Sequence, residues 1–285
     1  MPADVAVRPA PTATATVARR SHLRTVFAKA LRDERRGLIG WSIGMAAFGG
    51  YLLAAFPTIR HNPELKRLLE SYPEAMRKML SLRDFTTGPG YLQGEVFSFM
   101  APLLLVMVGV LYGSDATSGE EERRTIDLLL ANPVPRWRVV ADKAAAMATA
   151  LVVVSAALYA TLAVGDVVLG MGVSVAWLGA AVLASFLFAL DMGMLALALG
   201  AVTGRRGLSR GVVAVVAVAS YLVFGLADLV KALRPLRPFS LFYQSLGREP
   251  LFTGFAPWRT LVLVGVALAL AALAAVAFER RDLTS

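Results

Sequence analysis

Residues 176–203 read AWLGAAVLASFLFALDMGMLALALGAVT, with a single charged residue, Asp191, near the middle. A helix needs about 20 mostly apolar residues to cross roughly 30 Å of hydrocarbon, and this stretch is longer than that. Five further apolar stretches lie near residues 37–58, 95–113, 143–169, 209–230 and 259–278. The sequence therefore predicts an all-α polytopic membrane protein, with a six-span transmembrane domain over residues 37–281.

Composition agrees with this class and argues against several kinds of site. Apolar residues make up 57% of the chain and charged residues 17%, outside the usual soluble range. There is no cysteine, which excludes disulfides and thiolate metal sites. The two histidines, His22 and His61, flank the first span on opposite sides, so we expect no histidine metal cluster.

Lysine and arginine predict the orientation. With the N terminus inside, the inner segments hold 18 of these residues and the outer segments 11. By the positive-inside rule, both termini are then cytoplasmic. The net charge of +9 gathers beside the apolar stretches, which favours an anionic lipid bilayer rather than nucleic acid as its partner.

Four segments outside the spans have their own character. Residues 1–20, rich in Ala, Thr and Pro, are predicted to be a disordered cytoplasmic tail. Residues 21–36 are amphipathic and predict an interfacial helix with Ser21 as its cap, or else a basic flank that only sets topology. The outer segment 59–94 predicts two short amphipathic helices, followed by a turn over residues 86–90. These helices form either a gating lid or a packed cap. The outer segment 231–258 predicts short helices or an ordered loop.

The loop 114–142 is the most polar segment between two predicted spans. Thr117 and Ser118 are suited to cap a helix whose first turn carries Glu120, Glu121 and Glu122, where acids complement the helix dipole. A compact apolar patch follows, and two prolines then end the helix. An apolar patch on an exposed helix is typical of a surface that docks a partner.

The run EEERRTIDLLLANPVPRWR over residues 120–138, with Lys143 after it, resembles the permeases of the type-2 ABC exporter family. Their pattern is roughly an acid, then Gly-Thr-Leu/Ile-Glu-Leu-Leu-Leu, then Pro-Val/Ile-Ser/Thr-Arg and a Lys. This chain departs from it at Arg124, in the glycine position, and at Pro135, in the hydroxyl position. The likeness extends over most of residues 20–281.

The resemblance implies a permease in the bacterial cytoplasmic membrane that works with a separate ATPase. The loop would be a coupling helix docked on that subunit, through Glu120, Glu121, Glu122, Arg123, Arg124, Thr125, Ile126, Asp127, Leu128, Leu129, Leu130, Pro133 and Arg136. The chain has no P-loop, so it would be no enzyme itself, and the partner would bind ATP and Mg. A second permease copy, identical or related, would complete the complex. Arg205, Arg206 and Arg210 would form a smaller second contact, or only a basic anchor.

Asp191 supports an alternative. An acid at the bilayer centre costs about 2.5–3.5 kcal/mol and normally faces protein or water. Asp191 is therefore a candidate for the translocation path or a proton relay, unless it only bonds a neighbouring helix. The alternatives are a proton-coupled secondary transporter or a non-transporting sensor or immunity protein. The docking-like loop and the lack of an evident inverted repeat favour the ATP-driven exporter.

Glycines recur four residues apart at Gly40 and Gly44, at Gly109 and Gly113, and at Gly200 and Gly204. Such pairs allow close contact between helices in a membrane. We assign them to packing.

We expect Leu129→Asp to leave membrane insertion intact but to abolish association with the ATPase, because it puts a carboxylate into the apolar patch. Co-purification of the two chains measures this. Normal association would mean that the coupling helix lies elsewhere.

Overall fold

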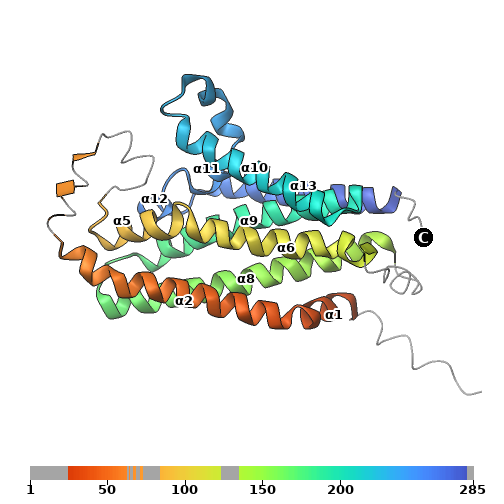
Figure 1. The fold of residues 1–285 in the computed structure, drawn as a ribbon, viewed down its shortest axis with the longest axis horizontal. Helices are drawn as coiled ribbons and strands as arrows, with labels where there is room; N and C mark the ends of the chain where they lie inside the picture. Colours follow the sequence, from red (N-terminus) through yellow and green to blue (C-terminus); the bar gives the residue numbers. More distant parts are fainter. Residues whose placement is uncertain are drawn as a thin grey trace, which may run out of the picture.

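The computed structural model describes residues 25–62, 64, 67–68, 71–72, 84–122 and 135–280. Within these ranges the secondary structure is helical throughout, without strands (Figure 1). Six helical segments are long and apolar enough to cross a membrane. The predicted fold class is therefore confirmed.

The spans follow one another in chain order. The first is α2 (Arg35–Arg60), preceded by α1 (Thr25–Asp33). The second combines α5 (Gly88–Leu92), the π-helix η2 (Gln93–Phe97) and α6 (Met100–Glu122). The others are α8 (Arg136–Leu169), α9 (Val175–Thr203), α10 (Arg206–Leu226) and α13 (Pro257–Arg280). Three short helices connect α10 to α13: the 3-10 helix η3 (Lys231–Phe239), α11 (Leu241–Leu246) and α12 (Pro250–Thr253). Of the two alternatives predicted for this segment, the structure shows short helices.

Helix α9 is the centre of the bundle. It packs against α6, α8, α10 and α13, and against the short α11 and α12. Its buried residues lie on all sides, as expected of a helix that is apolar all round. Helix α10 differs, because only Ser209, Val213 and Ser220 are buried along its length. Helix α10 is therefore less enclosed than α9, although it contacts α6, α9, α11 and η3.

The closest helix crossing lies between α6 and α9. A Cβ atom on Gly109 would lie 2.6 Å from the carbonyl oxygen of Ala189, and one on Gly113 would collide with the carbonyl oxygen of Gly193. Glycine lets two backbones approach in this way. In contrast, Cβ atoms on Gly40 or Gly44 would meet nothing within 4 Å.

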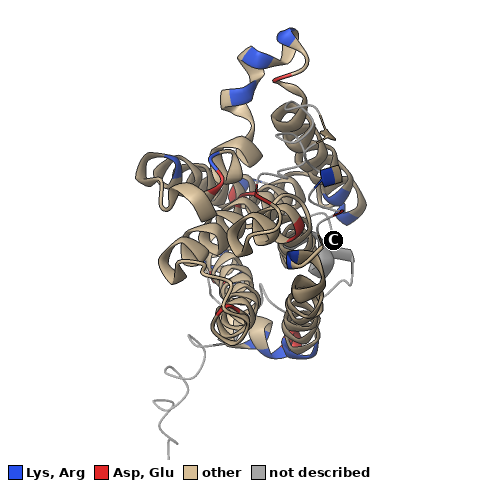
Figure 2. Ribbon diagram, turned by 90° about the vertical axis from the view of Figure 1, so that its left-hand side faces the viewer, with Lys and Arg blue, Asp and Glu red and all other residues tan. Residues whose placement is uncertain are grey.

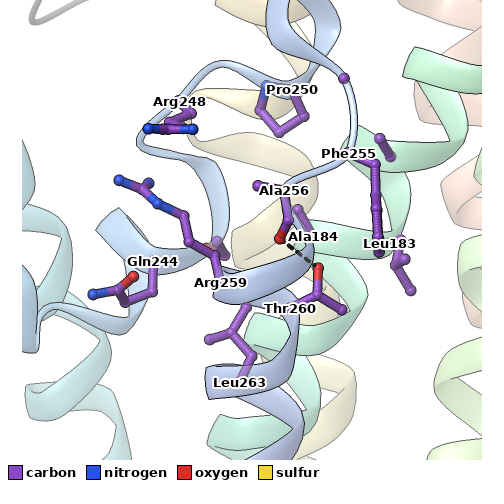
Figure 3. A pocket seen from close by; sticks show the side chains of 13 residues that line it. Leu183, Ala184, Gln244, Arg248, Pro250, Phe255, Ala256, Arg259, Thr260 and Leu263 are labelled. Carbon is purple, nitrogen blue, oxygen red and sulfur yellow. Dashed lines mark hydrogen bonds between the residues drawn. The ribbon is translucent and has the colours of Figure 1, made fainter.

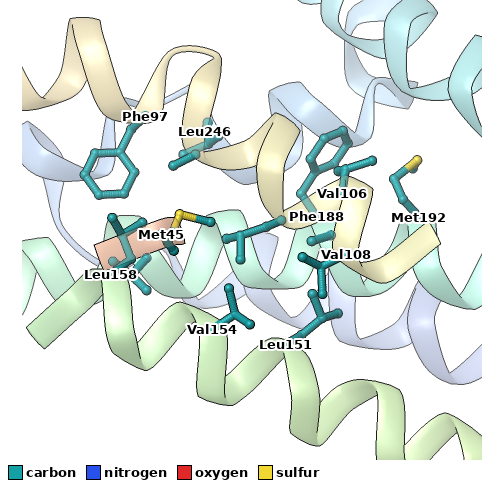
Figure 4. Close-up of a cluster of buried hydrophobic side chains, with 14 of the residues drawn as sticks. Met45, Phe97, Val106, Val108, Leu151, Val154, Leu158, Phe188, Met192 and Leu246 are labelled. Carbon is teal, nitrogen blue, oxygen red and sulfur yellow. The ribbon is translucent and has the colours of Figure 1, made fainter. Parts of the chain in front are cut away.

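The apolar core surrounds this crossing. Figure 4 shows side chains from several helices interdigitating between the ribbons, among them Met45 of α2, Phe97 of η2, Leu151 and Leu158 of α8, and Phe188 of α9. Lipid tails are as apolar as these side chains, so close packing rather than escape from water holds the spans together.

The two ends of the bundle differ in which helix ends lie there. Helix α1 and the last turn of α13 lie at the same end, together with the end of α6 and the starts of α8 and α10 (Figure 1). We name this the α1 end, and the opposite one, where α5 and α12 lie, the α12 end. The helix predicted over residues 21–36 is present as Thr25–Asp33 and packs against α8.

Two spans begin earlier than predicted. The second begins at Gly88 because Thr87 caps α5, with its Oγ1 accepting a hydrogen bond of 3.2 Å from the Gly90 amide. The predicted turn over residues 86–90 is therefore wrong from Gly88 onward. The third span begins at Arg136 rather than at residue 143, directly after the extended Pro135.

The predicted loop 114–142 is helical at both ends. Helix α6 continues to Glu122, so the prediction that a new helix begins at Thr117 and Ser118 is wrong. Thr117 and Ser118 are suited to the first position of a helix, but here they lie inside one, because α6 continues past them. Residues 123–134, which hold most of the predicted coupling helix, lie outside the described residues, as do Ser21 and much of segment 59–94.

We expect Gly113→Ala to destabilise the protein by about 1–3 kcal/mol, because its Cβ atom would push α6 away from α9. Thermal unfolding in detergent measures this. The control is Gly44→Ala, which has open space and gains about 0.5–1 kcal/mol from helix propensity. Equal stability of the two variants would refute a tight α6–α9 crossing.

Candidate functional site

The candidate site is a polar cluster at the α1 end, where α6 leads into the predicted coupling loop. Asp115 of α6 accepts hydrogen bonds from Arg206 Nη1 at 3.0 Å and from Arg210 Nη2 at 2.9 Å. Arg210 Nε also donates to Ser114 Oγ at 2.8 Å. These charge-assisted bonds join α6 to α10. The three charged side chains are partly exposed, so they contribute more to geometry than to stability.

The turn between α9 and α10 presents the two arginines. Gly204 ends α9 in the left-handed conformation with φ of +66°, which glycine adopts without strain. Ser209 Oγ then donates to the carbonyl oxygen of Ala196, which holds the first turn of α10 against α9. Arg206 and Arg210 are one helical turn apart and therefore face α6 together.

The structure thus gives two of the three arginines predicted to contact the ATPase a partner within the chain. Arg205 is exposed at the same turn. The contact with the ATPase itself stays a prediction. Sequence analysis missed Asp115 because it lies more than 90 residues from its partners. The available signal was a lone acid at the inner end of one span, facing a basic inner loop.

A second part of the cluster lies at the joint of α1 and α2. Burial raises the pKa of Glu34 from 4.5 to about 7, while nearby Lys143 opposes the rise and Asp115 adds to it. Lys143, the lysine that follows the loop motif, is only 8% exposed on α8. Charges from α6, α8 and the α1–α2 joint therefore act on one another beside the loop.

The predicted coupling residues are placed only in part. Glu120, Glu121 and Glu122 belong to the last turn of α6, and Arg136 begins α8. Helices α6 and α8 pack against each other, and the end of α6 and the start of α8 both lie at the α1 end. The residues between them lie outside the described ranges, and their docking role stays a prediction.

Asp191 lies away from this cluster, in the centre of α9. Its side chain is fully buried, and neither carboxylate oxygen has a hydrogen-bond donor within the described part of the chain. The alternative of a bond to a neighbouring Ser or Thr is therefore not observed. An unpaired, ionised carboxylate is costly in such a site, so Asp191 stays a candidate for the translocation path.

We expect the stability of the wild-type protein to fall as the pH rises from about 5 to about 8. The raised pKa of Glu34 means that the folded state holds its proton more tightly, so the stabilisation is full below about 4.5 and lost through about 7. Thermal unfolding of Glu34→Gln should depend less on pH, whereas the exposed control Glu279→Gln should follow the wild type. A wild-type profile parallel to that of Glu34→Gln would contradict this assignment.

A family model described as "ABC-2 family transporter protein" matches residues 24–283, almost the whole chain. No curated protein matches. The match confirms the resemblance drawn from the loop and is consistent with six spans. The chain belongs to the ABC-2 transporter family and is a multi-pass membrane permease.

Proposed function

We propose that this permease is the membrane subunit of an ATP-driven exporter, powered by a separate P-loop ATPase that docks on the loop between α6 and α8. Membership of the ABC-2 family supports the permease role. The observation that carries the proposal further is the Asp115 contact, because it links the helix leading into that loop to a second span.

The proposed mechanism is mechanical. Helix α6 runs unbroken from Met100 to Glu122, so a displacement of the loop would move the whole helix as a rigid element. Its tight crossing with α9 limits sliding, and Asp115 draws the start of α10 along with α6. Helix α10 has few fully buried residues, and its contacts with α9, α11 and η3 would adjust as it moves. ATP-driven closure of the partner would thus move α6 and α10 together and switch access.

The proposed arrangement in the membrane follows from charge. Among the described residues, the α1 end carries the basic residues of α1, of the starts of α2, α8 and α10 and of the end of α13, which supports a cytoplasmic location for it in the inner membrane of a bacterium. The ATPase would then approach the α1 end, bringing its own ATP and Mg. Two permease copies would share one transport path, with substrate leaving the cytoplasm or the inner leaflet.

A proton-coupled secondary transporter is the second candidate. The buried, unpaired Asp191 is the observation that favours it. In that case the carboxyl would release its proton whenever the bundle opened and water reached α9. Transport by the chain alone, dependent on a proton gradient, would distinguish this candidate.

We expect the tagged protein, purified from its native membrane in mild detergent, to bring a P-loop ATPase in near-equal amount. Mass spectrometry identifies the companion. Recovery of the permease alone, under conditions that preserve a known ABC complex, would overturn the exporter proposal.

In that complex, Asp115→Asn should retain the ATPase but lose ATP-dependent movement of α10. The chain has no cysteine, so spin labels on cysteines introduced at the exposed Val152 and Val215 report the distance between α8 and α10. Asp228→Asn, which breaks an ion pair of 2.9 Å with Arg237 away from the cluster, is the matched control. Unchanged movement in Asp115→Asn would rule out transmission through this contact.

A further inference from the structure

A small cleft lies at the α12 end, between α9, α11, α12 and the first turn of α13 (Figure 3). Leu183 and Leu263 supply apolar walls, and Gln244 and Thr260 supply polar groups. Its cavity volume is about 20 Å³, which is room for one water-sized group. The cleft therefore admits a single atom or hydroxyl, while anything larger stays at its mouth.

Two guanidinium groups stand at this mouth. Arg248 comes from the loop between α11 and α12, and Arg259 from the first turn of α13. Figure 3 shows both extending to the same side of the opening. Within the described ranges, no carboxylate forms an ion pair with either of them. Two cations directed at one space without a counter-charge from these ranges can together receive an anion from outside.

Arg259 is held in place by Tyr243. Its Nη1 donates to the Tyr243 carbonyl oxygen at 2.7 Å, and its guanidinium lies 4.4 Å from the centre of the Tyr243 ring. Arg237 covers the same ring at 4.6 Å. A guanidinium has five N–H donors, so this one bond leaves others for a ligand.

Arg248 is positioned by a constrained loop. The next residue, Glu249, has φ of +53°, a left-handed conformation that is unfavourable for a residue with a side chain. Buried Leu246 and Pro250 anchor the loop on both sides. Such conformations persist where the surrounding structure enforces them, often at ligand sites. The loop is thus shaped to present Arg248.

The surroundings of the cleft are basic. Residues 231–259 contain five lysines and arginines and one acid. Figure 2, which looks onto the α12 end, shows basic residues along the protruding η3 arm. Phe255 lines the cleft, and Trp258 lies beside the lining residue Arg259 in the chain. They are 54% and 75% exposed, and such aromatics suit the headgroup level of a bilayer. The excess of positive charge and the position of these aromatics both favour an anionic group at the membrane surface.

We propose that the mouth of this cleft binds a phosphate group, bridged by the Arg248 and Arg259 guanidiniums, with one oxygen or hydroxyl of the ligand entering the cavity. Guanidinium forks match the geometry of phosphate oxygens. The group belongs either to an anionic phospholipid headgroup or to a phosphate-bearing solute. The proposal does not rest on the exporter function, because binding needs neither ATP nor a partner.

The test uses the full chain, purified and delipidated in detergent, with phosphatidylglycerol and inorganic phosphate as separate probes. Native mass spectrometry measures bound phosphatidylglycerol, and its displacement by phosphate measures competition. We expect Arg248→Gln combined with Arg259→Gln to weaken phosphatidylglycerol binding about tenfold or more, since two charge-assisted contacts are lost. Arg234→Gln, an exposed cation on η3 outside the cleft, should bind as the wild type does.

If the double variant unfolds, Arg248→Gln alone provides the test. Loss of Arg259 removes a hydrogen bond to Tyr243, whereas Arg248 is exposed and its replacement should leave the fold intact. Displacement by inorganic phosphate would identify free phosphate as a sufficient ligand, and its failure to compete would identify the lipid headgroup. Wild-type binding by the Arg248 and Arg259 variants would overturn the proposal, because binding would then depend on neither arginine. An equal loss of binding in Arg234→Gln would also overturn it, because binding would then depend only on the overall positive charge of this end.

Discussion

The close approach of α6 to α9 is the constraint on which the rest of the structure depends. Gly109 and Gly113 place the backbone of α6 against that of α9, and α9 in turn contacts every other span except α2 closely. Because this crossing leaves no space for side chains, α6 cannot slide without moving its neighbours. The helix that leads into the coupling loop is therefore built into the centre of the bundle rather than attached to its edge.

Three acidic side chains of the bundle differ in their burial and in their partners. Asp115 lies at a helix end, partly exposed, and is paired with two arginines from another span. Glu34 lies at a helix joint, where burial raises its pKa to about 7. Asp191 is fully buried and without a donor among the described residues. Asp115 forms ion pairs with a second span whereas Asp191 has no such partner among the described residues, which is why we assign transmission to Asp115 and not to Asp191.

The two ends of the bundle differ in their charge pairing. At the α1 end, two arginines of α10 are paired with an acid of the same chain, which makes an internal connection. At the α12 end, Arg248 and Arg259 face a common opening without a carboxylate from the described ranges, which makes a site for an external anion. One end is thus suited to passing on movement, and the other to holding a ligand at the membrane surface.

The sequence by itself determined the number of spans, the helical class and the family, because a bilayer demands long apolar helices and the loop motif is local in the chain. It misplaced the starts at Gly88 and Arg136 and the cap at Thr117, since apolar length does not show where the backbone enters or leaves a helix. Only the tertiary structure decided that Asp115 pairs with Arg210, and that Arg248 and Arg259 share one opening. The physical reason is that these pairings depend on how spans cross and on how a strained loop is anchored, which no local pattern of residues encodes.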